Sequence, residues 1–276
     1  MRVIFDFGAN VGQNLEYYLQ KAEKVIAIEA NPKLCHEMSK EFETEVAQNR
    51  VVIINAVLAQ QEGTTTFWLN RELSVLSQLD EPSDPANFRP VQLPGREMKS
   101  IIEDNLNLGE EFLYSKFDLE GYDARALKSL FKSRNFPKHL SAEVQSLDAL
   151  ALLVFQKDYD KFKIVNGSQV AEKYKKVEIK IGENTRTFNF KHHSAGPFGE
   201  DLQEKIFSKW DIILEFNQVG TGWRDVHAEK SLRPTSMWRY FTSIYSVLFL
   251  MIKFLPVTRT LRLKILMKLY RFLGRG

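Results

Sequence analysis

Three apolar segments of the sequence end in acidic residues. Asp6 lies at the end of the run RVIFDF, Glu29 closes KVIAIE, and Asp118 follows FLYSKF. Apolar runs of this length predict buried strands, and ligands of open α/β sheets collect beyond the carboxyl ends of such strands. A carboxylate there can accept hydrogen bonds from a ribose or take a proton from a reacting hydroxyl. These acids are therefore the first candidates for binding and catalysis.

Two glycines bracket a short turn after the first of these strands, in the sequence Gly8-Ala9-Asn10-Val11-Gly12. Glycine lets the backbone approach a ligand closely, and the free amides of the helix that follows favour an electronegative group. Glu29 stands 21 residues after Gly8. A carboxylate in that position can hold both ribose hydroxyls. The spacing predicts a nucleoside cofactor.

The charge of this turn distinguishes between cofactors. A dinucleotide fingerprint reads G-x-G-x-x-G, and this turn lacks the middle glycine that lets the backbone contact a pyrophosphate. Asp6 is expected to direct negative charge at the site, which repels phosphates and attracts a cation. S-adenosylmethionine carries a sulfonium and an ammonium and has no phosphate. The sequence therefore favours S-adenosylmethionine over NAD.

Asp118 and Glu120 flank Leu119 at the end of the predicted fourth strand. The period of two in a strand would place both side chains on one face. One of them could orient an acceptor hydroxyl or remove its proton, an effect worth roughly 10²–10⁴-fold in rate. The alternative is that Asp118 caps the next helix and Glu120 is a solvated charge. Glu143, which ends the next predicted strand, is either an acceptor-side carboxylate or a surface acid.

The adjacent histidines His192 and His193 raise the question of a metal site. Neighbouring residues of an extended segment point in opposite directions, so this pair is not expected to bind one ion. We predict no metal. His193 is kept as a candidate catalytic base, because the loop SAGPFG that follows it could fold over the acceptor. Cys35, on a predicted helix, is expected to serve packing.

The elements that position these residues follow an alternating order. Strands are predicted at 2–7, 24–29 and 50–59, with helices over NLEYYLQKA and NPKLCHEMSKEF between them. FLYSKFDLE and HLSAEV predict the fourth and fifth strands, with helices over ALKSLFKS and DALALLVFQKD. The order predicts an α/β fold with a mostly parallel, doubly wound sheet.

Two further segments stand out. Residues 80–95 contain four prolines and are expected to form a loop or an edge excursion, while 63–69 is β-rich and could pair beside the third strand. The segment VEIKIGENTRTFNF alternates around the turn GEN and predicts a β-hairpin. It would be a C-terminal addition to the α/β fold.

The charge is divided unevenly along the chain. Residues 230–276 hold ten of the 38 basic residues and no acid, so residues 1–229 carry about −7 although the whole chain carries +3. The acidic body is a poor match for nucleic acid. The tail, basic on one helical face and apolar on the other, predicts a helix that binds an anionic membrane surface through 240–276. The alternative is an arm packed on the body or on the partner of a homodimer.

Five motifs, taken together, resemble the FkbM-type S-adenosylmethionine-dependent methyltransferases, over about residues 1–230. They are DFGANVG at 6–12, IEANP at 28–32, KFDLEGY at 116–122, SAGPFGEDL at 194–202 and WRDVHA at 223–228. The resemblance implies a Rossmann-like class I methyltransferase fold and transfer of a methyl group to a hydroxyl, often on a sugar or glycan. It also implies that the cofactor contacts Asp6, Gly8, Ala9, Asn10, Gly12, Glu29, Ala30, Asn31, Asn55 and Ala56.

This sequence departs from the family pattern in three places. It begins at the first strand without the helix that often covers the cofactor, Phe117 replaces an aliphatic residue, and Asp123 stands where glutamate is more usual. The division expected is a cofactor-binding core at 1–165, an acceptor-side extension with the hairpin at 166–229, and the basic tail at 230–276.

The function expected is O-methylation of a small-molecule or glycan hydroxyl, with a lipid-linked glycan among the acceptors considered. A single cysteine and the absence of a signal-like leader predict a cytoplasmic protein, at the inner face of the membrane if the tail binds there. The alternatives are a nicotinamide-dependent oxidoreductase and a non-catalytic, membrane-associated adaptor that keeps the cofactor fold.

Overall fold

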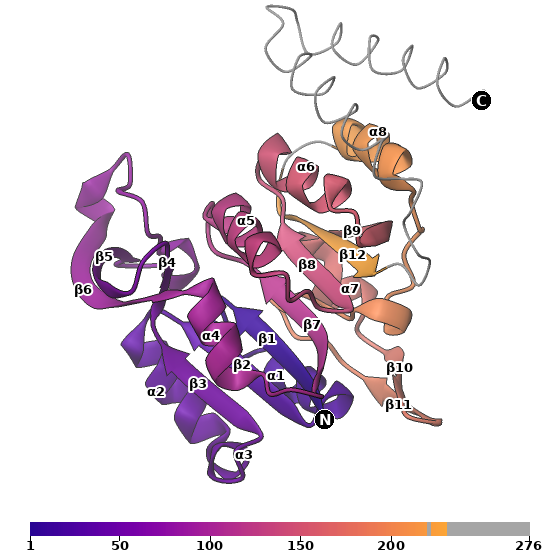
Figure 1. The fold of residues 1–276 in the computed structure, drawn as a ribbon, viewed down its shortest axis with the longest axis horizontal. Helices are drawn as coiled ribbons and strands as arrows, with labels where there is room; N and C mark the ends of the chain where they lie inside the picture. The colour runs from indigo at the N-terminus through magenta and orange to yellow at the C-terminus, as the bar shows by residue number, and fades with distance from the viewer. Residues whose placement is uncertain (220–221, 231–276) are drawn as a thin grey trace, which may run out of the picture.

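The computed structural model describes residues 1–219 and 222–230 (Figure 1). The predicted membrane-binding segment 240–276 lies outside these residues. The core is a seven-stranded sheet with the order β3-β2-β1-β7-β8-β12-β9. Its strands are β1 (Arg2–Phe7), β2 (Lys24–Glu29), β3 (Val51–Asn55), β7 (Glu111–Phe117), β8 (His139–Glu143), β9 (Tyr159–Asn166) and β12 (Arg224–Lys230).

The pairing of these strands is parallel from β3 to β8, and β12 runs antiparallel to both β8 and β9. Strands β1 and β2 are mostly apolar, as expected of strands covered on both faces of the sheet. In β1, five of the six residues are buried. The prediction of an α/β fold with a mostly parallel, doubly wound sheet is confirmed, and the order of its first strands is Rossmann-like.

Helices form a layer on each face of the sheet (Figure 1). Apolar residues of α4 (Met98–Asn105), α5 (Asp123–Ser133), α6 (Leu147–Phe155) and α8 (Lys209–Val219) pack with side chains such as Phe5 and Phe7 on one face. On the other face, α1 (Leu15–Lys21), α2 (Pro32–Glu41) and α7 (Val170–Lys173) pack with Ile4 and Val25. The short helix α3 (Glu43–Ala47) has no buried residue.

A separate three-stranded sheet follows β3, with the order β4-β6-β5, and projects from the central sheet in Figure 1. It consists of β4 (Val57–Ala59), β5 (Gly63–Asn70) and β6 (Phe88–Glu97). The predicted single strand 50–59 is thus wrong: it breaks at Ala56, and its second half pairs with β6. The β-rich segment 63–69 does form a strand, but it pairs with β6 rather than beside β3.

The proline-rich segment was expected to form a loop or an edge excursion, and its second half is strand β6 of the small sheet, outside the central sheet. Pro90 and Pro94 face β5 residues in the antiparallel pairing, whereas β4 reaches only Gly95–Glu97. Both prolines therefore lie where the other side of β6 has no partner strand, which is the position a sheet tolerates. Two short 3₁₀ helices, η1 (Ser74–Leu76) and η2 (Pro85–Asn87), lie between β5 and β6.

The C-terminal region combines one predicted element and one missed element. The hairpin is confirmed as β10 (Val177–Ile181) and β11 (Asn184–Phe188). The segment around WRDVHA, which was not assigned to a strand, is β12, and it inserts between β8 and β9. The 3₁₀ helices η3 (Gly167–Gln169) and η4 (Gly199–Asp201) lie beside the hairpin in sequence. Among the described residues, no helix has the length and apolar character needed to cross a bilayer.

The direction of the chain reverses across the sheet between β1 and β7. From β1 the chain builds outward through β2 to β3, and it then returns to place β7 on the opposite side of β1. In open α/β sheets this switch point opens a crevice outside the carboxyl ends of the strands. The carboxyl ends of β1, β2, β7 and β8 carry Gly8, Glu29, Asp118 and Glu143 in or directly after the strands.

Candidate functional site

A cavity of about 390 Å³ lies at these carboxyl ends. Its walls come from the glycine turn, the end of β2, the small sheet, the loop after β7, the end of β8 and the segment before β12. Of the residues predicted to act, eight line it: Gly8, Asn10, Glu29, Ala30, Ala56, Asp118, Glu120 and His193. Five predicted residues do not: Asp6, Ala9, Gly12, Asn31 and Asn55.

The two glycines of the turn are required by contacts within the chain itself. Gly8 has a φ of +83°, and a Cβ atom there would lie 2.0 Å from the carbonyl oxygen of Asp118. Gly12 has a φ of +80°, and its Cβ would lie 2.8 Å from Cγ of Met38. Side chains other than hydrogen are therefore excluded at both positions. The sequence assigned these glycines to close approach of a ligand, and the structure shows close approach of the turn to β7 and α2.

Glu29 is held at the edge of the cavity by two backbone amides. Oε2 accepts a hydrogen bond from the Asn10 amide at 2.9 Å, and Oε1 accepts one from the Asn31 amide at 2.7 Å. Asn10 adopts a φ of +51°, a left-handed conformation that asparagine tolerates. Burial raises the pKa of Glu29 to about 7, although both amides oppose the shift. The carboxylate is fixed in position and keeps lone pairs for further donors.

Two other asparagines predicted to bind the cofactor, Asn31 and Asn55, stabilise the chain next to Glu29. Asn55 donates from Nδ2 to the carbonyl oxygens of Glu29 and Ala30, at 3.1 and 2.9 Å. Asn31 caps α2, with Oδ1 accepting from the Lys33 amide at 3.0 Å. These bonds order the chain after β2, so both side chains position the wall without lining the cavity.

Asp6 does not face the cavity, which corrects the expectation that its charge points at a ligand. Its side chain is fully buried, and Oδ1 lies 3.6 Å from Nζ of Lys116. Asp6 and Lys116 are direct partners in the β1–β7 register, so the two strands bring the charges together. Burial raises the pKa of Asp6 to about 6, opposed by the charge of Lys116. Asp6 is therefore part of an internal ion pair below the cavity.

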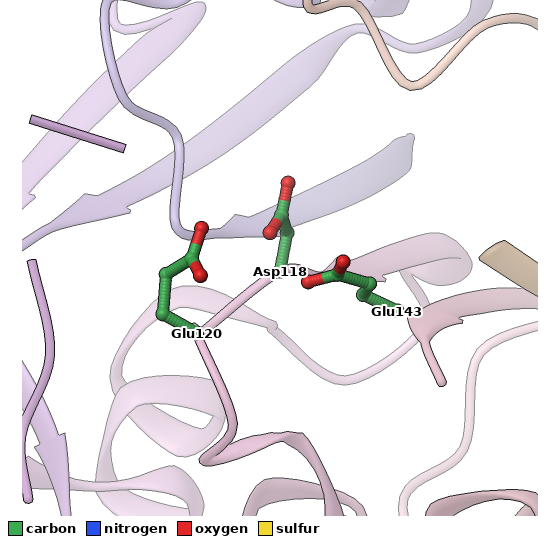
Figure 2. Close-up of side chains that lie close together, drawn as sticks. All are labelled: Asp118, Glu120 and Glu143. Atoms are coloured by element: carbon green, nitrogen blue, oxygen red, sulfur yellow. The ribbon is translucent and has the colours of Figure 1, made fainter. Parts of the chain in front are cut away.

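Three acids form the opposite wall, and we refer to Asp118, Glu120 and Glu143 as the carboxylate triad (Figure 2). One oxygen of each lies within 4.8 Å of the others. The predicted reason for their proximity is wrong, since β7 ends at Phe117 and Glu120 lies in a turn with a φ of +48°. This left-handed turn, rather than strand periodicity, directs Glu120 toward Asp118. Glu143 comes from the end of the neighbouring strand β8.

The triad carries more negative charge than its surroundings balance. Nζ of Lys116 lies 3.1 Å from Oδ2 of Asp118, and burial of this ammonium is outweighed by Asp118 and Asp6, which hold the pKa of Lys116 above its ordinary value. Within the described part of the chain, no ion pair reaches Glu120 or Glu143. Burial, followed by the charge of Asp118, raises the pKa of Glu120 to about 8 and that of Glu143 to about 7.

The arrangement of the triad also suits a metal ion, a grouping that the sequence interpretation did not consider. That interpretation looked for ligands beside the histidines and predicted none. The signal available was Glu143, the acid that ends the strand next to β7. His192 and His193 are not on an extended segment: His193 has a φ of +63°, and the two rings lie 4.2 Å apart. They are not part of the ligand group found among the described residues.

Apolar residues of the small sheet and of the connection between β5 and β6 also line the cavity. They are Val57, Leu58, Phe67, Leu76 and Leu79. Arg125 of α5 fixes this connection through two bonds to the Asp80 carboxylate, at 2.7 and 2.8 Å. The cavity is thus lined by apolar side chains as well as by acids.

An aromatic pair completes the cavity from the C-terminal region. The Trp223 indole lies directly against Gly167, where a Cβ would come within 2.3 Å of the ring. The His193 ring stacks on Trp223 with centroids 5.8 Å apart. His193 is held in turn by Gln13, whose Nε2 donates to its carbonyl oxygen at 2.9 Å. Trp223 was not predicted as a site residue, since its placement depends on β12.

The loop that carries His193 is anchored on α1. The Asn14 side chain accepts hydrogen bonds from Ser194 Oγ at 2.8 Å and from the Ala195 amide at 2.9 Å. Tyr17 donates to Asp201 at 2.8 Å and accepts from the Phe198 amide at 3.2 Å. The C-terminal region therefore reaches the cavity through the helix that begins after the glycine turn.

Comparison with known proteins gives structural similarities only. The sequence matches no family model and no curated protein. Among solved structures, methyltransferase FkbM from Methylobacillus flagellatus aligns with a TM-score of 0.39 and 16% identity, over 58% of this chain and 39% of that one. An S-adenosylmethionine-dependent O-methyltransferase from Thermotoga maritima aligns with a TM-score of 0.35 and 11% identity, over 84% and 60% of the two chains.

TrmK from M. capricolum, in complex with S-adenosylhomocysteine, aligns with a TM-score of 0.35 and 10% identity, over 99% of this chain and 91% of that one. The chain thus spans well under half of the FkbM structure and about three fifths of the Thermotoga structure. The TM-scores are too low for these similarities to assign an activity. The cavity's own residues carry the functional proposal.

Proposed function

We propose that this chain is an S-adenosylmethionine-dependent O-methyltransferase. The observation that carries the proposal is the Glu29 carboxylate, fixed by the Asn10 and Asn31 amides at the edge of a cavity at the switch point of the sheet. A carboxylate at the end of the second strand is the group that holds ribose hydroxyls in nucleotide-binding α/β folds. Each oxygen of Glu29 already accepts one bond and has room for a second from a ribose.

The sign of the charge supports a sulfonium nucleoside over a dinucleotide. Asp6 is buried below the cavity, so it cannot supply the charge that the sequence interpretation gave it. The carboxylate triad supplies that charge instead, because all three acids line the cavity. Pyrophosphate is repelled by such a wall, whereas a sulfonium and an ammonium are attracted. A ribose on Glu29 with its sulfur toward the triad satisfies both ends of the cofactor.

Methyl transfer in this cavity is an in-line displacement. The acceptor oxygen attacks the methyl carbon, the bond from carbon to sulfur breaks, and the hydroxyl proton passes to a base. Holding the two reactants together can supply about 7–11 kcal/mol of the barrier reduction. Asp118 and Glu120 are the proposed catalytic carboxylates, and His193 is a further candidate to orient or deprotonate the acceptor, since all three line the cavity.

The proposed acceptor is a hydroxyl of a sugar or glycan. The support is a rigid aromatic surface, Trp223 stacked with His193, close to acids that accept hydrogen bonds. A sugar ring presents C–H groups that pack on such a surface and hydroxyls that donate to carboxylates. Screening glycan extracts for methyl incorporation, with Trp223→Ala as the loss-of-binding variant, tests this acceptor class.

Membrane attachment and homodimerisation are further proposals that rest on the sequence alone. The basic, apolar segment 240–276 supports binding to the inner face of an anionic membrane. Flotation with anionic liposomes, comparing the full chain with a version that ends at Lys230, tests the attachment. Light scattering of both versions tests whether the segment serves a dimer instead.

Calorimetry of the full chain with S-adenosylmethionine tests the proposed cofactor. We expect binding with one molecule per chain, and we expect Glu29→Ala to weaken it by at least about tenfold, since a hydrogen bond to a charged group contributes about 1.5–3 kcal/mol. Glu41→Ala, an exposed acid of α2, is the matched control and should bind as the wild type. Failure of the wild type to bind, or binding of NADH in its place, contradicts the proposal.

A further inference from the structure

The carboxylate triad gathers three oxygen ligands from two fixed points of the fold (Figure 2). Asp118 and Glu120 belong to the turn after β7, and Glu143 ends β8, the strand that pairs with β7. Glu143 is 7% exposed, and Gln145 donates to its Oε2 at 2.8 Å. Figure 2 shows the carboxyl groups turned toward one another. Acids placed this close repel one another unless a cation or a shared proton lies between them.

The positively charged side chain closest to the triad among the described residues, Lys116, already forms ion pairs. Lys116 lies between Asp118 and Asp6, at 3.1 and 3.6 Å. The ion pairs of residues 1–219 and 222–230 include neither Glu120 nor Glu143. One ammonium therefore faces two carboxylates, and the two remaining members of the triad form no ion pair with the described chain, although the charge of Lys116 acts on them from farther away.

The buried carboxyl group of Asp123, close to the triad, also has an oxygen without a partner. Asp123 is 2% exposed, and its Oδ1 accepts a hydrogen bond at 3.2 Å from the amide of Leu119, the residue between Asp118 and Glu120. This bond turns the Asp123 carboxyl toward the turn that carries two triad members. Its other oxygen, Oδ2, is buried with no hydrogen-bond partner. An unpartnered buried carboxylate is costly unless a positive charge lies near it.

A second buried acid lies beside the triad. Asp225 of β12 is directly opposite Glu143 in the antiparallel pairing, so the two side chains share one face of the sheet. Asp225 is 5% exposed. Its burial, followed by the charge of Asp118, holds its pKa well above the ordinary value. Five acids thus surround a point that one partly engaged lysine approaches.

We propose that Asp118, Glu120 and Glu143 bind a divalent cation of the hard, oxygen-preferring class, such as Mg²⁺, Mn²⁺ or Ca²⁺. Two oxygens on one Ca²⁺ ion lie at most about 5 Å apart, and two on Mg²⁺ about 4.2 Å. Three oxygens spread evenly around one Ca²⁺ ion lie at most about 4.5 Å apart. The triad's oxygens, within 4.8 Å of one another, therefore need a small closing movement to bind Ca²⁺ and a larger one to bind Mg²⁺. The ligands are all carboxylates, which suits these ions better than Zn²⁺ or Cu²⁺.

The cation would also take part in catalysis. This role rests on the proposed function, whereas the binding of the cation does not. The triad lines the cavity, so the ion would keep coordination positions open to an acceptor hydroxyl. A bound divalent ion lowers the pKa of an oxygen that it contacts and orients that oxygen. The Asp118, Glu120 and Glu143 side chains would then act as ligands that place the acceptor. The proton of the polarised hydroxyl would pass to His193, the remaining candidate base on the cavity wall.

Titration of the metal-free full chain with Mn²⁺, followed by electron paramagnetic resonance, tests the site directly. We expect one bound Mn²⁺ per chain that Mg²⁺ or Ca²⁺ displaces. Glu120→Gln and Glu143→Gln each remove one charged ligand and should weaken Mn²⁺ binding by about tenfold or more. Even the loss of a residue that only hydrogen-bonds to a metal ligand commonly has an effect of this size. Glu111→Gln changes an exposed acid at the opposite end of β7 and should bind Mn²⁺ as the wild type.

Thermal melting and calorimetry with S-adenosylhomocysteine on the same samples separate the outcomes. The melting temperature of the wild type should rise with Mn²⁺ concentration, and that of the two glutamine variants should rise much less. A wild type that binds S-adenosylhomocysteine but no Mn²⁺ at millimolar concentration overturns the cation site and leaves the proposed function standing. A wild type that binds Mn²⁺ but no nucleoside does the reverse. Equal Mn²⁺ affinity of wild type and both glutamine variants also overturns the site.

Discussion

The two acidic walls of the cavity use the same chemical group in opposite ways. Glu29 receives hydrogen bonds from two backbone amides and is fixed by the chain around it. In the carboxylate triad, Glu143 receives a bond from Gln145, and the charges are otherwise balanced only by Lys116 at Asp118. One wall is a prepared acceptor for neutral hydroxyl donors. The other is a concentration of negative charge that favours a cation.

The difference shows that the backbone, and not the side-chain type, decides what an acid at a strand end can do. Asn10 adopts a left-handed conformation that turns its amide toward Glu29. Glu120 adopts the same kind of conformation, and there it directs a carboxylate toward two others. The turn at Asn10 supplies an amide donor to Glu29, whereas the turn at Glu120 brings carboxyl groups close together. The ribose of the nucleoside and the divalent cation therefore belong to different walls of one cavity.

The largest effect is expected where the two walls meet, at Gly8. Its amide donates to the Ile28 carbonyl beside Glu29, while a Cβ would strike the Asp118 carbonyl. Gly8→Ala should cost about 2–5 kcal/mol, from a left-handed conformation and an overpacked contact together. Gly109→Ala has a similar φ of +87° but no atom near its Cβ, and should cost only about 1–2 kcal/mol. Urea unfolding measures both, and equal costs would contradict the close approach.

Exchanging one acid on each wall should separate the two ligands. Glu29→Gln should weaken S-adenosylhomocysteine binding by about tenfold or more, from loss of a charged acceptor, and leave Mn²⁺ affinity unchanged. Glu143→Gln should weaken Mn²⁺ binding and leave the nucleoside affinity within about threefold. Calorimetry and Mn²⁺ resonance on both variants provide the four values. A variant that impairs both ligands equally would show that the walls do not act separately.

The protonation of Glu29 should make nucleoside affinity depend on pH. Its pKa is raised to about 7, so the carboxyl is mostly protonated at pH 6 and mostly ionised at pH 8. The ionised form is the better acceptor for ribose hydroxyls, and affinity should therefore rise by up to about tenfold between these values. Glu29→Gln should flatten this profile in calorimetry. A profile that falls with pH, or one unchanged by the substitution, would contradict the role of Glu29.

The smallest effect on ligand binding is expected at Asn31. Its side chain is predicted to stabilise the chain beside Glu29 without contacting the ligand. Asn31→Ala removes the side-chain bond to the Lys33 amide but keeps the backbone amide that donates to Glu29. Loss of this helix cap should cost about 1 kcal/mol in urea unfolding. Nucleoside affinity should stay within about twofold of the wild type. A large loss of affinity would show that the Asn31 side chain contacts the ligand.

Much of the parallel sheet could be predicted because its signals are local. The runs ending at Phe7 and Glu29 are mostly apolar, and the order of strand and helix predicts a doubly wound arrangement. The placement of β12 could not be predicted, since RDVHAEK carries little strand signal and pairs with two strands distant in sequence. Trp223, which precedes β12, was missed for the same reason.

The site was predicted in part for a related physical reason. Glu29 could be placed from its position at the end of a strand. The environment of Asp6 could not, because Lys116 reaches it only through the β1–β7 register. The triad depends on the left-handed turn at Glu120 and on the β7–β8 pairing, and neither is visible as a local pattern. The distances between residues at different strand ends could therefore be known only from the folded structure.

A crystal structure of the full chain with S-adenosylhomocysteine tests most directly whether the two walls hold different parts of one reaction. We predict the ribose hydroxyls on the Glu29 carboxylate and the sulfur directed toward Asp118, Glu120 and Glu143. A nucleoside bound with its ribose on the triad, or bound outside this cavity, would contradict the central claim.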